Sequence, residues 1–116
     1  MGKPTVQSAQ IRIMPDQDPD TSYLDQEGFE DRKRAFEKGD FGFVGVMAVA
    51  EVEVGGVMQE ITSGGIWGIE SDSGTKYFRS VGKEEYDALK GVLRDMNAAK
   101  IPAYKNVPIA DSAHYI

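Results

Sequence analysis

The chain has 116 residues, the length of about one compact domain, and 41% of them are hydrophobic, enough for a folded core. Its 13 basic and 19 acidic residues give a net charge of −6, which argues against a protein that grips phosphate backbones. The absence of cysteine excludes disulfides, thiolate metal sites and cysteine nucleophiles. The single histidine excludes a multi-histidine metal site within one chain.

No apolar run reaches the roughly 18 residues of a membrane span. The first residues, MGKPTVQSAQ, lack the apolar segment of a secretory signal. We therefore expect a soluble, cytoplasmic protein with no membrane partner.

The first half of the chain predicts a strand, an acidic segment and a short helix. Alternating apolar residues over Thr5 to Met14 predict a strand that ends at Pro15, and we expect this strand at a sheet edge. Residues 15–40 carry nine acids against four bases, so −5 of the net charge lies there. Good helix formers over Phe29 to Lys38, followed by Gly39, predict an amphipathic helix.

The segment from Phe41 to Val54 is rich in valine and alternates at its end, which predicts a strand. Gly55-Gly56 fits a two-residue hairpin turn that needs positive φ, so Val57 begins the return strand. This turn pairs Val54 with Val57, and by the same register Val52 with Gln59 and Ala50 with Ile61. The opposite face of the hairpin then carries Glu51, Glu53, Met58 and Glu60.

In the second half, Ser63-Gly64-Gly65 interrupts the return strand and Ile66 to Glu70 resumes it. After a turn at residues 71–74, we expect a strand over Thr75 to Val81 and a helix over Lys83 to Met96 that packs on a sheet. Prolines predict an extended tail over residues 101–116. The fold expected for residues 1–116 is a single α+β domain, with a twisted antiparallel sheet of four to five strands and two helices in the order β-α-β-β-β-α.

The acidic segment resembles a calcium-binding loop in part. Asp16, Asp18, Asp20 and Glu27 stand at positions 1, 3, 5 and 12 of such a loop. However, position 6 is Thr21 instead of glycine, and the preceding residues predict a strand instead of a helix. We expect a solvated acidic loop and no metal or other cofactor, with calcium binding as the alternative.

The segment ITSGGIWGIESD, residues 61–72, holds the only tryptophan of the chain. It lacks the lysine and the spacing of a phosphate-binding loop, so it predicts no nucleotide site. The ordinary interpretation is a bent strand in which Trp67 fills the core. The alternative is that Trp67 is a partly exposed anchor for a partner, because tryptophan is enriched at binding hot spots.

No motif for a catalytic nucleophile accompanies His114, which we expect to be solvated. Glu51, Glu53 and Glu60 can gather on one sheet face, but exposed acids on an antiparallel sheet are ordinary. An enzyme would need a cleft that joins Glu51 or Glu60 to Ser63. We therefore expect no catalytic activity.

Three stretches resemble a family of small proteins from bacteriophages and mobile elements: residues 18–24 (DPDTSYL), the Phe43–Val46 strand running into residues 50–52, and above all ITSGGIWGIESD. The resemblance covers most of residues 10–95. The link between Leu24 and the first helix is shorter in this chain than in many members of the family. The family carries no established catalytic residues, so the resemblance assigns no catalytic role to any residue of this chain.

From this resemblance, the acidity and the small size, we expect a protein that binds and inhibits a host protein in the cytoplasm of the bacterial host cell, such as a CRISPR or restriction defence component. The partner is expected to be basic or nucleic-acid-binding, with no direct contact between this chain and nucleic acid. The alternative is an accessory module that binds a small molecule or a metal. The residues expected at the partner surface are Asp16, Asp18, Asp20, Asp25, Glu27, Glu30, Asp31 and Trp67.

Overall fold

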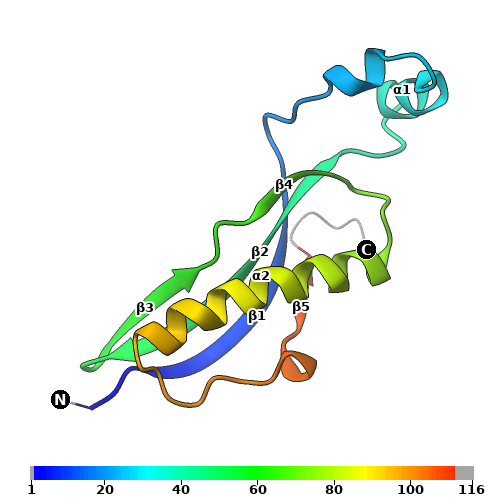
Figure 1. The fold of residues 1–116 in the computed structure, drawn as a ribbon. Coiled ribbons are helices and arrows are strands. Elements are labelled where there is room, and N and C mark those ends of the chain that lie inside the picture. Colours follow the sequence, from blue (N-terminus) through cyan, green and yellow to red (C-terminus); the bar gives the residue numbers. More distant parts are fainter. Residues whose placement is uncertain (1, 112–116) are drawn as a thin grey trace.

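A single long strand, β2 (Phe43–Val54), organises the molecule, because three other strands pair with it (Figure 1). The structure is a computed structural model that describes residues 2–111. Strand β1 (Thr5–Pro15) pairs antiparallel along nearly all of one edge of β2. On the other edge, β3 (Val57–Thr62) pairs with the second half of β2 and β4 (Ile66–Glu70) with the first half.

The predicted hairpin is confirmed. Gly55 and Gly56 adopt φ of 58° and 83°, as a two-residue turn between strands requires. The register pairs Val54 with Val57, Val52 with Gln59 and Ala50 with Ile61. Since side chains alternate along a strand, this register separates a valine- and alanine-rich face of β2 from one that carries Glu51 and Glu53.

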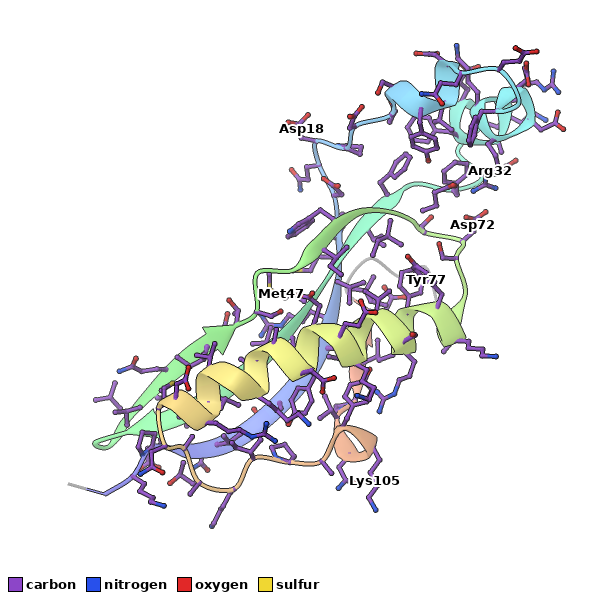
Figure 2. All side chains as sticks on the ribbon, viewed as in Figure 1. Asp18, Arg32, Met47, Asp72, Tyr77 and Lys105 are labelled. Atoms are coloured by element: carbon purple, nitrogen blue, oxygen red, sulfur yellow. The ribbon has the colours of Figure 1, made fainter. Side chains whose placement is uncertain are left out.

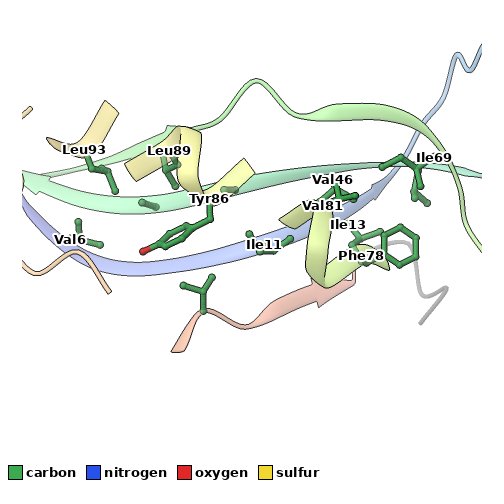
Figure 3. Close-up of a cluster of buried hydrophobic side chains, with 14 of the residues drawn as sticks. Val6, Ile11, Ile13, Val46, Ile69, Phe78, Val81, Tyr86, Leu89 and Leu93 are labelled. Carbon is green, nitrogen blue, oxygen red and sulfur yellow. The ribbon is translucent and has the colours of Figure 1, made fainter. Parts of the chain in front are cut away.

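The long helix α2 (Thr75–Asp95) covers the valine- and alanine-rich face of the sheet, and the main core lies between them (Figure 3). Its buried side chains recur at three- and four-residue spacing, which makes a continuous apolar stripe. The stripe packs on Ile11 and Ile13 of β1 and on the even-numbered residues of β2 from Val44 to Val52. The helical residues of this stripe are Phe78, Val81, Gly82, Tyr86, Leu89 and Leu93.

The segment after α2 lies along the helix and returns to the sheet. The Tyr86 hydroxyl donates to the Pro102 carbonyl at 2.5 Å, and the Arg79 guanidinium donates to the carbonyls of Tyr104 and Val107. A short 3-10 turn, η2 (Tyr104–Asn106), then leads into β5 (Ile109–Asp111), which pairs with β1. The predicted extended tail is thus laid over the body as far as residue 111, and His114 lies outside the described residues.

A small lobe stands at one end of the molecule, which measures 58 × 23 × 19 Å (Figure 1). We call residues 16–42 the lobe. It contains the 3-10 turn η1 (Ser22–Asp25) and the helix α1 (Glu30–Glu37), which confirms the predicted short helix. A second apolar cluster, separate from the main core, holds the lobe on the sheet and consists of Leu24, Phe41 and Phe43 with Tyr23, Ala35 and Phe36 packed around them.

The α+β class, the two helices and four of the expected strands agree with the sequence expectation, and three details differ. Residues 75–81 are the first two turns of α2 and not a strand, because Phe78, Val81 and Gly82 continue the helical stripe. The sheet is mixed, since β5 runs parallel to β1. This pairing also places β1 between β2 and β5 instead of at the edge.

Candidate functional site

Residues 61–72, which we call the strap, run along one edge of β2 as the end of β3, a bend and all of β4. The bend is held by Glu85 of α2, whose carboxylate accepts hydrogen bonds from the Ser63 hydroxyl and the Gly65 amide, both at 2.8 Å. The Ser63 hydroxyl in turn accepts from the Ala48 amide at 2.9 Å. At the bend, the Gly65 amide thus bonds to a side chain of α2, while β2 stays paired with β3 before the bend and with β4 after it.

Several hydrogen bonds and ion pairs join the strap to the lobe. The Asp16 carboxylate accepts from the Gly68 amide at 2.9 Å. The Arg32 guanidinium donates twice to Asp72 and once to Glu70, at 2.6 to 3.0 Å, and stacks 4.0 Å from the centre of the Phe41 ring. The pKa of Asp72 is lowered because Arg32 donates to its carboxylate. Most polar residues of the motif ITSGGIWGIESD therefore have a structural role.

Trp67, the large aromatic residue of the same motif, does not lie in the core. Its indole ring lies against the backbone of Gly45, where an added Cβ would be only 2.2 Å from Cε3 of the ring. Gly45 alternates with the core residues Val44 and Val46, so the ring lies on the sheet face that α2 does not cover. The side chain is 47% exposed, so the expectation of a core tryptophan is wrong and the alternative of a partly exposed position is correct.

We call the sheet face away from α2 the open face. Next to Trp67 it carries Met47 and Met14, which are half-buried and come from β2 and β1. Farther from the lobe, Arg12 of β1 forms a salt bridge across β2 with Glu60 of β3 at 3.4 Å. Beyond it, Glu51 lies directly opposite Glu60. The open face therefore has an apolar end beside the lobe, to which Met47 (labelled in Figure 2) belongs, and a charged end beside the hairpin.

The acidic residues expected at the partner surface fall into three groups. Asp16, Asp20 and Glu30 accept hydrogen bonds from nearby backbone amides, which order the turns of the lobe. Asp25 pairs with Lys33 at 2.7 Å, and Asp31 pairs with Arg34. Asp18 and Glu27 are exposed, and their carboxylates form no hydrogen bond or ion pair with the rest of residues 2–111.

These contacts shift several pKa values in the lobe. Hydrogen bonds from Ser22 lower the pKa of Asp20, and the Asp25 carboxylate raises the pKa of Lys33. Burial, followed by the nearby charge of Glu70, raises the pKa of Tyr23. Within residues 2–111 no group of three or more histidine, cysteine, aspartate or glutamate side chains is placed to hold a metal ion. The partial calcium-loop pattern therefore corresponds to hydrogen-bonded turns in this structure.

The structure brings only part of the expected partner surface together. Trp67 lies beside the first acidic residues of the lobe, because its neighbour Gly68 is bonded to Asp16. Asp25, Glu27, Glu30 and Asp31 lie farther out, on η1, α1 and the link between them. Between η1 and α1 lies an open hollow of about 550 Å³, lined mostly by charged side chains that include Glu27 and Lys33.

A second, smaller hollow lies on the open face next to Glu51. It measures about 220 Å³ and is lined by Gln10, Val49 and Pro108 besides Glu51. Neither Ser63 nor Glu60 lines it, so this hollow is not the cleft that an enzyme built on these residues would need. Ser63 is also buried, and its hydroxyl is engaged by both Glu85 and the Ala48 amide.

Sequence reasoning missed Gly45, Met47 and Glu85 as parts of this region. Gly45 carried a usable signal, because a glycine inside a strand pattern often marks the close approach of another group. Glu85 carried none, since its partners lie about 20 residues away along the chain.

No helix within residues 2–111 is long and apolar enough to cross a membrane. Searches against protein-family models, curated proteins and solved structures found no match to this chain.

Proposed function

We propose that this chain is a non-catalytic protein-binding module whose contact surface joins Trp67 on the open face to the acidic lobe. The observation that carries the proposal is the seating of Trp67. A large aromatic side chain lies flat against glycine and remains half-exposed, although the strand has an apolar core on its other face.

A tryptophan that lies against a glycine and stays half-exposed favours a role in binding over a role in stability. The indole lies against Gly45 and beside Gly65, so little side-chain freedom remains to be lost when a partner covers it. Its exposed part, with Met14 and Met47 beside it, offers an apolar contact next to charged residues. Buried tryptophans surrounded by polar residues are the usual hot spots of protein interfaces.

The lobe supplies charge to the same surface. It carries nine acids against four bases, and the carboxylates of Asp18 and Glu27 form no ion pair with any residue from 2 to 111. A net charge of −5 concentrated at one end attracts a basic surface and accelerates its association. We therefore propose a partner that is basic, as nucleic-acid-binding proteins are.

The resemblance to proteins of bacteriophages and mobile elements supports a more specific form of the proposal. The partner would be a host protein, and a CRISPR or restriction component fits because its nucleic-acid groove is basic. The acidic lobe would occupy that groove and inhibit the component.

The proposal is tested by expressing the chain in bacteria that carry a defined CRISPR or restriction system and measuring the plating efficiency of a targeted phage. We expect the wild-type chain to restore plating, and both Trp67→Ala and the double variant Asp18→Asn/Glu27→Gln to reduce that rescue at least about tenfold. Tyr77→Ala removes an equally exposed aromatic of α2 and serves as the matched control. Lack of rescue in every system tested, or full rescue by Trp67→Ala, would contradict the proposal.

A further inference from the structure

The outer edge of β3 is open along its whole length. Within residues 2–111, β3 pairs with β2 on one side, and no strand pairs with its other side. Because Val54 and Val57 flank a two-residue turn, they form a hydrogen-bonded pair, and such pairs recur at every second residue. The amide of Ser63 indeed bonds to the Ala48 carbonyl, which extends the same series.

It follows that the odd-numbered residues of β3 direct their backbone groups toward β2. The amides and carbonyls of Met58, Glu60 and Thr62 therefore point outward, away from the sheet. An exposed row of backbone donors and acceptors is a template for another strand.

Exposed apolar side chains gather along this edge on both faces of the sheet. Val57 is 60% exposed on the α2 side, and Met58 is 52% exposed on the open face. Val92 of α2 is 44% exposed and lies two helical turns after Glu85, whose carboxylate binds the bend beside β3. Val92 is thus on the flank of the helix that faces β3. Exposed apolar groups above and below an unpaired strand favour a partner that adds to that strand.

We propose that this edge binds a second copy of the chain, with the two β3 strands antiparallel about a twofold axis through Gln59. This register sets Val57 opposite Ile61 of the second copy and Met58 opposite its Glu60, so no like charges face each other. The outward amides and carbonyls of Met58 and Glu60 bond across the axis. The register centred one residue later would place the two Glu60 carboxylates directly opposite, which is unfavourable.

Charge along the molecule agrees with this arrangement. Most of the negative charge lies in the lobe, and β3 lies toward the other end of the 58 Å axis (Figure 1). A twofold axis through Gln59 directs the two lobes away from each other. The two copies therefore meet at their nearly neutral ends, where Glu60 is already paired with Arg12. The strap residues Ile66 and Trp67 stay outside the paired segment, so the dimer leaves the proposed partner surface free.

Sedimentation equilibrium over a range of protein concentrations tests the pairing. We expect the wild-type chain to form a dimer and Met58→Pro to weaken its association at least about tenfold, because proline removes one outward amide and leaves the β2–β3 hydrogen bonds intact. Met58→Thr keeps that amide and separates the loss of a hydrogen bond from the loss of a side chain. It should retain most of the association, and circular dichroism checks that each variant folds.

Cross-linking tests the register, since the chain has no cysteine of its own. Gln59→Cys places two thiols opposite each other at the axis, so mild oxidation should yield a covalent dimer much faster than for Ala103→Cys, an exposed site after α2. A monomer at all concentrations, dimerisation unaffected by Met58→Pro, or equal cross-linking at both sites would overturn the proposal. A monomer whose binding to another protein is lost in Met58→Pro would assign the edge to a strand of that protein and would also overturn it.

Discussion

The indole ring of Trp67 occupies the space into which any side chain at position 45 would point. An alanine there would place its Cβ 2.2 Å from the ring, so Gly45→Ala must displace Trp67 or the strand. We expect a loss of about 1–3 kcal/mol in the free energy of unfolding, as for other overpacked sites. Because Trp67 is the only tryptophan, its fluorescence reports the displacement directly. The control Gly64→Ala meets no atom within 4 Å and should leave the emission unchanged.

Glu85 holds the bend of the strap by accepting from Ser63 and Gly65. Glu85→Ala leaves the buried Ser63 hydroxyl and the Gly65 amide without this partner, so we expect a cost of about 1–3 kcal/mol. Hydrogen exchange at the Gly65 amide should accelerate more than exchange in β1. The neighbouring Glu84→Ala removes an exposed carboxylate and is the matched control. Equal stability of both variants would show that the bend holds without Glu85.

Arg32 ties the lobe to the strap through Glu70 and Asp72. Arg32→Lys keeps the charge but loses the planar fork that reaches both carboxylates and stacks on Phe41. We expect faster hydrogen exchange in α1 with little change in the β1–β2 ladder, because the lobe has its own apolar cluster. Arg34→Lys alters only an exposed pair with Asp31 and should have no such effect.

Acid should loosen the same connection. Arg32 lowers the pKa of Asp72 below its ordinary value of 3.8, so the carboxylate stabilises the folded state above that pH. This stabilisation is lost as the pH falls from 3.8 through the lowered pKa. Asp20 and Asp87 also have lowered pKa values and contribute to the acid sensitivity of the wild type. The contribution of Asp72 is therefore measured as the difference in stability between the wild type and a variant that lacks this carboxylate. Unfolding of the wild type and of Asp72→Asn should differ least at the lowest pH, and a gap that does not narrow would contradict this assignment.

Gly82 allows α2 to approach the sheet and the C-terminal segment. An added Cβ would be 2.7 Å from the Tyr104 hydroxyl oxygen and 3.1 Å from two carbons of Ile11. We expect Gly82→Ala to lower the melting temperature despite the better helix propensity of alanine. Gly91 lies on the same helix, and a Cβ added there meets no other part of the protein within 4 Å. Gly91→Ala should therefore stabilise the protein by up to about 1 kcal/mol.

Local patterns predicted the parts of this fold that depend on neighbouring residues. The register of β2 and β3 was predictable because a two-residue glycine turn determines which residues face each other. The start of α2 was not, because Gly82 and the β-branched or aromatic residues before it are weak helix formers. Contacts with Tyr104 and Ile11, which bring the helix close to the sheet, explain why a glycine is accommodated there.

The candidate site was less predictable, because its ties join distant parts of the chain. Asp16 and Gly68 are 52 residues apart, and Arg32 and Asp72 are 40 apart. No local period encodes such pairs. Trp67 was singled out by its residue type, but its position on the open face depends on Gly45 in another strand. The parallel pairing of β5 was hidden for a similar reason, since the strand has only three residues and directly follows a proline.

The position of the lobe at the end of a 58 Å molecule also has an electrical consequence. A charge of −5 lies there, while the rest of the chain contributes only −1. The protein therefore carries a large permanent dipole moment along its length. The field of a positively charged surface exerts a torque on this dipole. The torque turns the lobe, and with it the adjoining Trp67, toward that surface before contact is made.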